Sequence, residues 1–197
     1  MKTEEEKPKI GWDIDDIIFP LMENYLAFHN NKHGTKLELK DVYNYHLWKC
    51  GIHSSKEESV KEVLEFQNSP AFDRIDLIPG AREVLGKISK KHEIHFVTSR
   101  PEVIKSKTEI LLNRNFPKNG FKILYSGEIY GGKLSKAEIC KINNIPLLIE
   151  DNPDYAIDCA RNGIKVILLN HPWNVNCEEH ERIIRINELK EVLEVLK

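Results

Sequence analysis

The sequence of 197 residues lacks any long apolar segment. Its longest uninterrupted apolar stretches, around residues 145–149 and 166–169, fall far short of the roughly 18 residues that cross a bilayer. The first nine residues are charged and contain no apolar core of the kind found in secretory signal peptides. We therefore expect a cytoplasmic protein with no membrane partner.

The sequence also has no excess of positive charge and no closely spaced pair of cysteines. Lys plus Arg number 29 against 31 Asp plus Glu, a net charge of −2, which argues against binding a nucleic acid polymer through bulk positive charge. The four cysteines form no CxxC pair, and their spacing fits neither a zinc site nor a disulfide framework. With 41% hydrophobic and 30% charged residues and no repeats, the composition is that of one globular domain with room for a small insertion.

What the sequence does contain, from residue 80 onward, is an alternation of apolar strands and helices. Such alternation is typical of parallel βαβ units in a three-layer α/β sandwich. The helix starts carry capping patterns, Ser99 with Glu102, Ser135 with Glu138, and Asn152 before Pro153, and Gly163 fits just past a helix end. We predict strands at 9–14, 93–98, 121–125, 146–149 and 165–169, and helices at 81–91, 101–114, 135–143, from 153 to about 162 and at 188–196.

The stretch between the first strand and the rest of the sheet has a different residue pattern, without alternating strands and helices. Residues 21–31 and 56–67 have helical patterns, and the part between them carries several aromatic residues. Pro79 and Gly80 mark the return to the alternating pattern. We predict a core formed by residues 1–19 and 76–197, with a small helical insertion at residues 20–75.

Ligands of open parallel sheets bind at the carboxyl ends of the strands. Asp13 and Asp15 follow the first predicted strand, and their spacing of two points both side chains to one side in extended chain. Several further polar residues fall at the same edge: Thr98, Ser99 and Arg100; Lys133 and Lys136; and Glu150 and Asp151.

This set of residues suits a phosphoryl group. Carboxylates crowded at one edge repel one another unless a hard cation such as Mg²⁺ neutralises them. One carboxylate of the Asp13–Asp15 pair can attack phosphorus while the other moves the proton, and a lysine and a hydroxyl can hold the phosphate. Each motif alone is weak, but they occur in order at one predicted edge.

The order of motifs resembles the haloacid dehalogenase-like (HAD) superfamily of phosphohydrolases. The matching segments are I-G-W-D-I-D-D-I-I with Asp13 and Asp15, I-H-F-V-T-S-R with Thr98, a following lysine, and L-L-I-E-D-N-P-D with Glu150 and Asp151. The resemblance spans roughly residues 8–175. It implies a Rossmann-like core with a helical cap after the Asp13–Asp15 motif. This is the position at which the residue pattern alone predicts the insertion.

Within the superfamily the chain is most similar to the 5′(3′)-deoxyribonucleotidase group. The I-P-G-A-R-E-V-L and H-P-W-N segments carry that similarity, together with the length of the insertion. It implies Mg²⁺-dependent dephosphorylation of nucleoside monophosphates through an aspartyl-phosphate. By it, the nucleophile is Asp13 and the general acid/base Asp15; the metal is held by Asp13, the backbone carbonyl of Asp15 and Asp151; phosphate is held by Thr98, Ser99 and Lys136 or Lys133; and Glu150 is a supporting acid.

The context S-K-A-E-I-C favours Lys136 over Lys133 as the phosphate ligand. Aromatic side chains of the insertion could stack on a base, although buried aromatics more often only pack. The candidates for substrate contact are Phe19, Tyr45, Trp48 and Arg100. A phosphatase for sugar phosphates or other small organic phosphates and a non-catalytic phosphate-binding domain stay open as alternatives, and a homodimer is expected by resemblance only.

Overall fold

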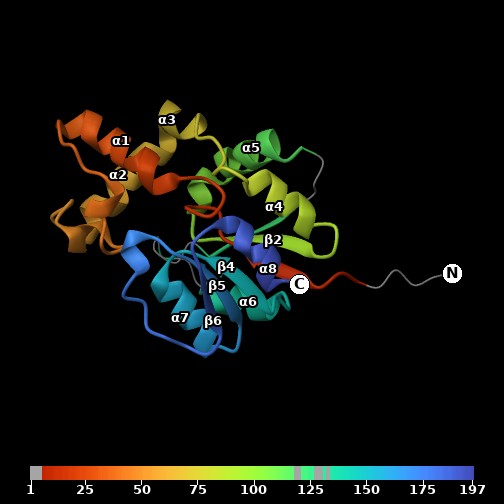
Figure 1. Cartoon of the computed structure of the whole chain (residues 1–197). Helices are drawn as coiled ribbons and strands as arrows, with labels where there is room; N and C mark the ends of the chain where they lie inside the picture. Colours follow the sequence, from red (N-terminus) through yellow and green to blue (C-terminus); the bar gives the residue numbers. More distant parts are fainter. Residues whose placement is uncertain (1–5, 118–120, 127–130, 132–133) are drawn as a thin grey trace.

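The computed structural model describes residues 6–117, 121–126, 131 and 134–197. Its centre is a six-stranded sheet in the order β3-β2-β1-β4-β5-β6 (Figure 1), and all five neighbouring pairs of strands are parallel. The strands are β1 (Lys9–Trp12), β2 (Glu93–Thr98), β3 (Lys122–Tyr125), β4 (Leu147–Glu150), β5 (Lys165–Leu169) and β6 (Ile183–Ile186). The predicted α/β class with a central parallel sheet is confirmed.

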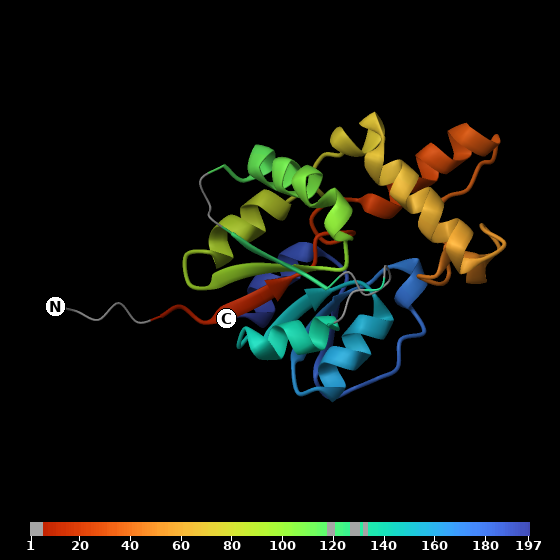
Figure 2. The ribbon, with the colours of Figure 1, turned by 180° about the vertical axis from the view of Figure 1, so that it is seen from behind.

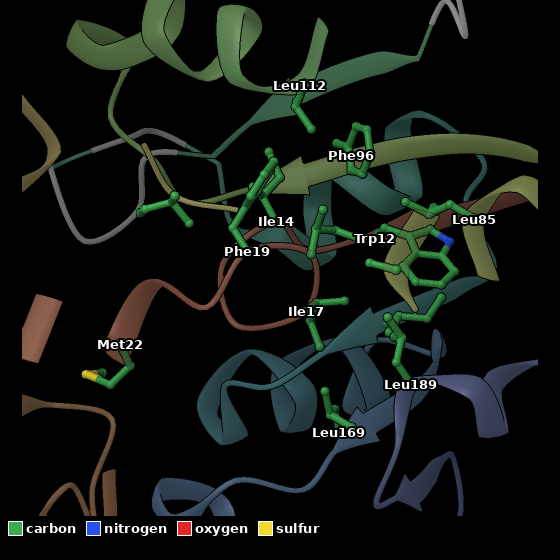
Figure 3. Packing of buried hydrophobic residues seen from close by; sticks show 14 of the residues in the cluster. Trp12, Ile14, Ile17, Phe19, Met22, Leu85, Phe96, Leu112, Leu169 and Leu189 are labelled. Carbon is green, nitrogen blue, oxygen red and sulfur yellow. The ribbon is translucent and has the colours of Figure 1, made fainter. Parts of the chain in front are cut away.

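Successive residues of the central strands belong to two separate apolar clusters, which makes the fold three layers deep. Phe96 and Ile149 join one cluster, whereas their neighbours Val97 and Leu148 join the other. The first cluster is covered by α4 (Ala81–Ile88), α5 (Lys105–Asn115) and α8 (Val192–Val195), and the second by α6 (Lys136–Ile142) and α7 (Pro153–Arg161). Figure 3 shows Trp12 of β1 near Leu85 and Leu189 in the first of them.

The segment between β1 and α4 is helical, as predicted. It contains α1 (Leu21–His33), α2 (Lys56–Asn68) and α3 (Pro70–Asp73), with short 3-10 turns η1 (Leu39–Asp41) and η2 (Leu47–Cys50) between α1 and α2. Figure 2 shows these helices beyond the arrowhead of β1, at the carboxyl ends of the strands. Tyr25, Phe66 and Phe72 of this segment join the same apolar cluster as the first face of the sheet. The division at residues 20 and 75 stays a prediction.

The chain turns sharply between β1 and α1. The carbonyl of Ile14 accepts hydrogen bonds from the backbone N–H groups of Ile18 and Phe19, and Asp16 adopts a left-handed φ of 56°. The Asp16 carboxylate then accepts from the N–H of Met22 at 3.0 Å, in the first turn of α1. Such an acceptor satisfies a free backbone donor at the start of the helix, and its negative charge interacts favourably with the helix dipole.

Most helix boundaries were predicted correctly from their capping residues. Ser135 and Glu138 form the reciprocal capping box of α6, the Asn152 side chain caps α7, and Gly163 follows α7 with a φ of +87°. The predicted cap at Ser99 is wrong. The chain runs extended through Pro101 into a 3-10 turn, η3 (Glu102–Ile104), before α5 begins.

The predicted helix at 188–196 is present as two consecutive short segments, the 3-10 turn η6 (Leu189–Glu191) and α8. The edge strand β6, which precedes them, was not predicted. Because β6 lies at the edge, only its last residue, Ile186, is buried, and its sequence I-I-R-I shows no clean alternation. An edge strand of four residues leaves little periodic signal.

The loop after β5 is tied to the turn after β1 by a half-buried histidine. His171 Nε2 lies 3.0 Å from the carbonyl oxygen of Asp16, and its side chain also accepts from the backbone N–H of Asn174. The ring stacks on Trp173 with centroids 4.3 Å apart. One ring nitrogen donates and the other accepts, so the ring is neutral, and burial lowers its pKa from 6.5 to about 4.

Close packing around Gly11 leads to a first prediction. A Cβ atom there would lie 2.9 Å from Leu148 Cδ1 and 3.1 Å from Ile145 Cγ2, inside the sheet. Gly11→Ala should therefore lower the free energy of unfolding by about 1–3 kcal/mol in urea denaturation. Gly86→Ala is the matched control, because no atom lies within 4 Å of its Cβ position in α4, and alanine there should stabilise by about 0.5–1 kcal/mol. Equal stability of the two variants would contradict this packing.

The neutral state of His171 leads to a second prediction. Because the unfolded chain binds a proton on this ring below about pH 6.5 and the folded chain only below about 4, stability should fall as the pH is lowered across that window. The loss attributable to His171 should reach up to about 3 kcal/mol. We expect urea denaturation at pH 7.0 and 4.5 to show a smaller loss for His171→Gln than for wild type or for His180→Gln. A loss of the same size in all three proteins would exclude this role.

Candidate active site

The carboxyl ends of β1, β2 and β4 bring the predicted polar residues together. The backbone N–H of Asp13 donates to the Ile149 carbonyl at 2.9 Å, which extends the β1–β4 pairing by one residue and sets the Asp13 side chain at the edge. Asp13 and Asp15 both line a pocket between this edge and the helical insertion. Asp13 and Asp15 are therefore on the same side of the chain, as their spacing of two predicts.

Lys136 lies at the centre of the cluster. Its ammonium group is 2.9 Å from Asp13 Oδ1 and 2.7 Å from Glu150 Oε2, and it sits 4.7 Å from the centre of the Tyr155 ring. Only 1% of the Lys136 side chain is exposed, so the charge is held wholly by these partners. Lys133, the alternative in the sequence, lies outside the described residues.

Glu150 ends β4 and Asp151 follows it, and the two carboxylates have different surroundings. Glu150 is fully buried, and besides Lys136 it accepts from the backbone N–H groups of Asp151 and Asn152. Asp151 Oδ2 accepts from the indole N–H of Trp173 at 2.9 Å. Trp173, which follows β5, thus orients the Asp151 carboxylate.

Burial and mutual repulsion shift the protonation of the carboxylates. Burial, assisted by Glu150 and Asp15 and opposed by Lys136, raises the pKa of Asp13 to about 7. Burial, followed by the charge of Glu150, raises the pKa of Asp151 well above its usual range. One lysine is too little positive charge for the carboxylates that surround it, and a divalent cation would lower these pKa values again.

The donor atoms fit such a cation. Asp13, Glu150 and Asp151 each offer a carboxylate oxygen within 4.8 Å of the others. Asp13 Oδ1 is buried and, among the described residues, has no hydrogen-bond partner of suitable geometry. Because Glu150 is occupied by Lys136 and two backbone donors, Asp13 and Asp151 are the freer pair. Oxygen donors alone suit Mg²⁺ better than a softer metal.

Asp15 forms a contact that the sequence analysis did not anticipate. Arg100 Nη2 donates to Asp15 Oδ1 at 2.6 Å, and Nε donates to both carboxylate oxygens at 3.1–3.2 Å. The guanidinium, whose side chain is fully buried, also donates to Thr108 Oγ1 and lies 4.9 Å from the centre of the Phe72 ring. Arg100, expected to touch substrate, lines the pocket, and its guanidinium is held by Asp15, which it orients. Only its place directly after β2 could have suggested this pairing.

The two hydroxyl residues at the end of β2, Thr98 and Ser99, are placed differently. The Thr98 side chain is fully buried, and its Oγ1 accepts from the backbone N–H of Arg100 at 3.1 Å. Ser99 lines the pocket. Of the two expected phosphate ligands, Ser99 faces the space that a ligand would enter.

The insertion supplies most of the remaining pocket wall. Tyr45 and Trp48, two of the aromatic candidates, line the pocket. Phe19 does not line it. Its side chain is fully buried in the apolar cluster beside Ile14 (Figure 3), so the prediction that Phe19 contacts substrate is wrong. The lining residues that the sequence analysis missed are Leu21, Met22, Tyr25, His46, Leu47, Ser59, Val60, Val63 and Gln67. The helical spacing of 21, 22 and 25, and of 59, 60, 63 and 67, is the signal that could have found one face of α1 and of α2.

A contact across the rim joins the insertion to the core. His46 Nε2 lies 2.9 Å from Asp154 Oδ2, and this hydrogen bond lowers the pKa of Asp154. The His46 ring stacks on Trp48, with centroids 4.5 Å apart. The pair thus fixes Trp48 over the pocket from the side of α7.

The chain resembles known proteins in sequence and in fold. A nucleotidase from Clostridium acetobutylicum is 26% identical over 169 residues, which are 86% of this chain and 83% of that protein. A haloacid dehalogenase-like hydrolase from Streptococcus pneumoniae superposes with a TM-score of 0.70 at 13% identity, covering 97% of this chain and 99% of that one. The YfnB protein of Bacillus subtilis, solved bound to magnesium, gives a TM-score of 0.65 at 16% identity, covering 98% and 99%.

No helix among the described residues is both long and apolar enough to cross a membrane.

The sequence also matches the model of a known protein family. The family model of the 5′ nucleotidase, deoxy (pyrimidine), cytosolic type C proteins matches residues 7–197, nearly the whole chain. The chain therefore belongs to this family of HAD-like nucleotidases and is a phosphoric monoester hydrolase.

Proposed function

We propose that the protein is a Mg²⁺-dependent phosphatase of nucleoside monophosphates that acts through an aspartyl-phosphate on Asp13. The observation that carries this proposal is the Asp13 carboxylate. It is buried, lines the pocket and lies, through Oδ1, 2.9 Å from the Lys136 ammonium group. A nucleophile needs an available lone pair and nearby positive charge to receive a phosphoryl group.

In the first step, a carboxylate oxygen of Asp13 attacks phosphorus, and the bond from phosphorus to the leaving oxygen breaks. Asp15 gives that oxygen a proton. In the second step, Asp15 takes a proton from water as the water oxygen attacks phosphorus, and Asp13 is released as a carboxylate. Arg100 holds the Asp15 carboxylate in one orientation through three hydrogen bonds.

Lys136, Ser99 and Thr98 are the proposed phosphate-binding residues. Lys136 supplies positive charge, and its ion pairs with Asp13 and Glu150 fix its position. Asp13, Asp151 and the backbone carbonyl of Asp15 would hold Mg²⁺, which supplies charge neutralisation for the phosphoryl oxygens. Glu150 acts by holding Lys136 and the turn that carries Asp151.

The pocket wall supports a nucleoside as the leaving group. Trp48 and Tyr45 offer aromatic faces, and Val60 and Val63 of α2 add an apolar wall. A base can stack on such a surface, whereas a sugar phosphate has little flat area to bury. The match to a deoxynucleotidase family points the same way.

The nucleophile is tested by Asp13→Asn. We expect phosphate release from nucleoside monophosphates in the presence of Mg²⁺ to fall at least about a thousandfold, because the amide cannot form the acyl phosphate. Asp76→Asn, an exposed aspartate elsewhere, is the matched control and should keep wild-type rates. Circular dichroism should show that both variants are folded. An Asp13→Asn enzyme with most of its activity would rule out the proposed nucleophile.

The leaving group is tested by Trp48→Ala. We expect kcat/KM for deoxynucleoside monophosphates to fall about tenfold or more, the scale of one lost stacking contact, while release from a small sugar phosphate is unchanged. Tyr43→Ala is the control, since Tyr43 belongs to the same segment but is 61% exposed and is not among the pocket-lining residues. If wild type hydrolyses sugar phosphates as fast as nucleotides, the nucleotidase proposal fails but the phosphatase survives.

A further inference from the structure

A second cluster of metal-binding side chains lies inside the helical insertion, behind the pocket wall. His29 and His33 project from α1 one turn apart, His53 comes from the loop before α2, and Glu62 comes from α2. His29, His53 and Glu62 are only 5%, 5% and 6% exposed. Three separate segments thus place imidazole and carboxylate groups at one buried point.

The contacts within this cluster are short. His29 Nδ1 lies 2.5 Å and His53 Nε2 3.9 Å from Glu62 Oε1, and His33 Nε2 lies 2.6 Å from Glu62 Oε2. The ligand atoms of His29, His53 and Glu62 all fall within 4.8 Å of one another. In a tetrahedral site with bonds of about 2.0–2.1 Å, ligand atoms are roughly 3.3 Å apart. The observed separations lie on both sides of that value.

We propose that His29, His53 and Glu62, joined by His33, form a binding site for a divalent transition metal such as Zn²⁺. Imidazole nitrogens and one carboxylate oxygen are the donors that this class of ion prefers, and Mg²⁺ prefers oxygen alone. Four protein ligands give a closed site, which is structural rather than catalytic. Each imidazole binds through a neutral nitrogen, and its remaining proton stays on the other ring nitrogen.

The neighbouring groups are compatible with an ion at this point. Lys32 Nζ lies 3.4 Å from Glu62 Oε2, but it is also 2.6 Å from Glu65, and 36% of its side chain is exposed, so it can remain paired with Glu65 alone. Tyr25 donates to Glu62 Oε1 at 3.0 Å and lies 2.5 Å from His53 Nε2. A metal would displace the second contact and leave the first.

The position of the cluster gives the site a role. Tyr25 contacts Glu62 and His53 with its hydroxyl and also lines the pocket at the strand ends. An ion bound to α1, to the loop carrying His53 and to α2 would fix the two helices that form one wall of that pocket. This inference does not rest on the proposed substrate or on the aspartyl-phosphate.

The test uses the full chain, freed of metal with a chelator and then kept in saturating Mg²⁺ to fill the oxygen-rich site. Titration with Co²⁺ should show one equivalent bound with the intense visible absorption of a four-coordinate ion. Zn²⁺ should compete for it and raise the melting temperature. X-ray absorption of the Zn²⁺ form should show at least two imidazole ligands, a result that needs no variant.

Variants separate this site from the one at the strand ends. His53→Gln and Glu62→Gln should weaken Zn²⁺ binding on the order of tenfold or more and abolish the rise in melting temperature. His180→Gln and Asp151→Asn should keep both responses. The proposal is overturned if wild type binds no Co²⁺ in saturating Mg²⁺, if the bound ion has only oxygen ligands, or if the folded His53 and Glu62 variants bind Zn²⁺ as tightly as wild type.

Discussion

The buried ion pair of Lys136 with Asp13 and Glu150 is the constraint on which the site depends. It joins the end of β1, the end of β4 and the first residue of α6, and almost none of it reaches solvent. A buried charge is tolerated only when it is paired, so the three residues require one another. Asp13 also lines the pocket, so the arrangement that anchors the strand ends holds the proposed nucleophile at the pocket wall.

The rest of the architecture places groups around that pair. Gly11 leaves room on β1 for the side chains of Leu148 and Ile145, and the hydrogen bond from the Asp13 N–H to Ile149 sets Asp13 level with the end of β4. The sharp turn after β1 then sends the chain into α1, with Asp16 capping that helix and His171 holding the turn from the far side. The insertion is therefore fixed to the sheet at the point where the chemistry is proposed, and its aromatic residues face the same space.

Much of this could be predicted from the sequence, because apolar strands and capping residues are local signals. The edge that gathers Asp13, Asp15, Glu150, Asp151 and Lys136 follows from parallel strands alone, and the placement of the insertion follows from its different texture. The features that the sequence did not predict depend on contacts between distant residues or leave only a weak sequence pattern. The contact between Arg100 and Asp15 joins residues 85 positions apart, Phe19 packs beside Ile14 in the core, and β6 lies at an edge with one buried residue. The H-x-x-x-H spacing of His29 and His33 was present in the sequence but gained meaning only once His53 and Glu62 lay beside it.

The stacking of Phe72 on Arg100 links the insertion to proton transfer. Phe72 belongs to α3, the last helix before α4, and the guanidinium it covers is the one that orients Asp15. An exchange of the insertion between homologous enzymes would therefore have two natural boundaries. A graft that ends before residue 69 would carry over the pocket wall alone, whereas a graft that continues through α3 would also replace the support of the acid/base residue. Substrate preference and the efficiency of proton transfer are thus separable by a few residues of chain.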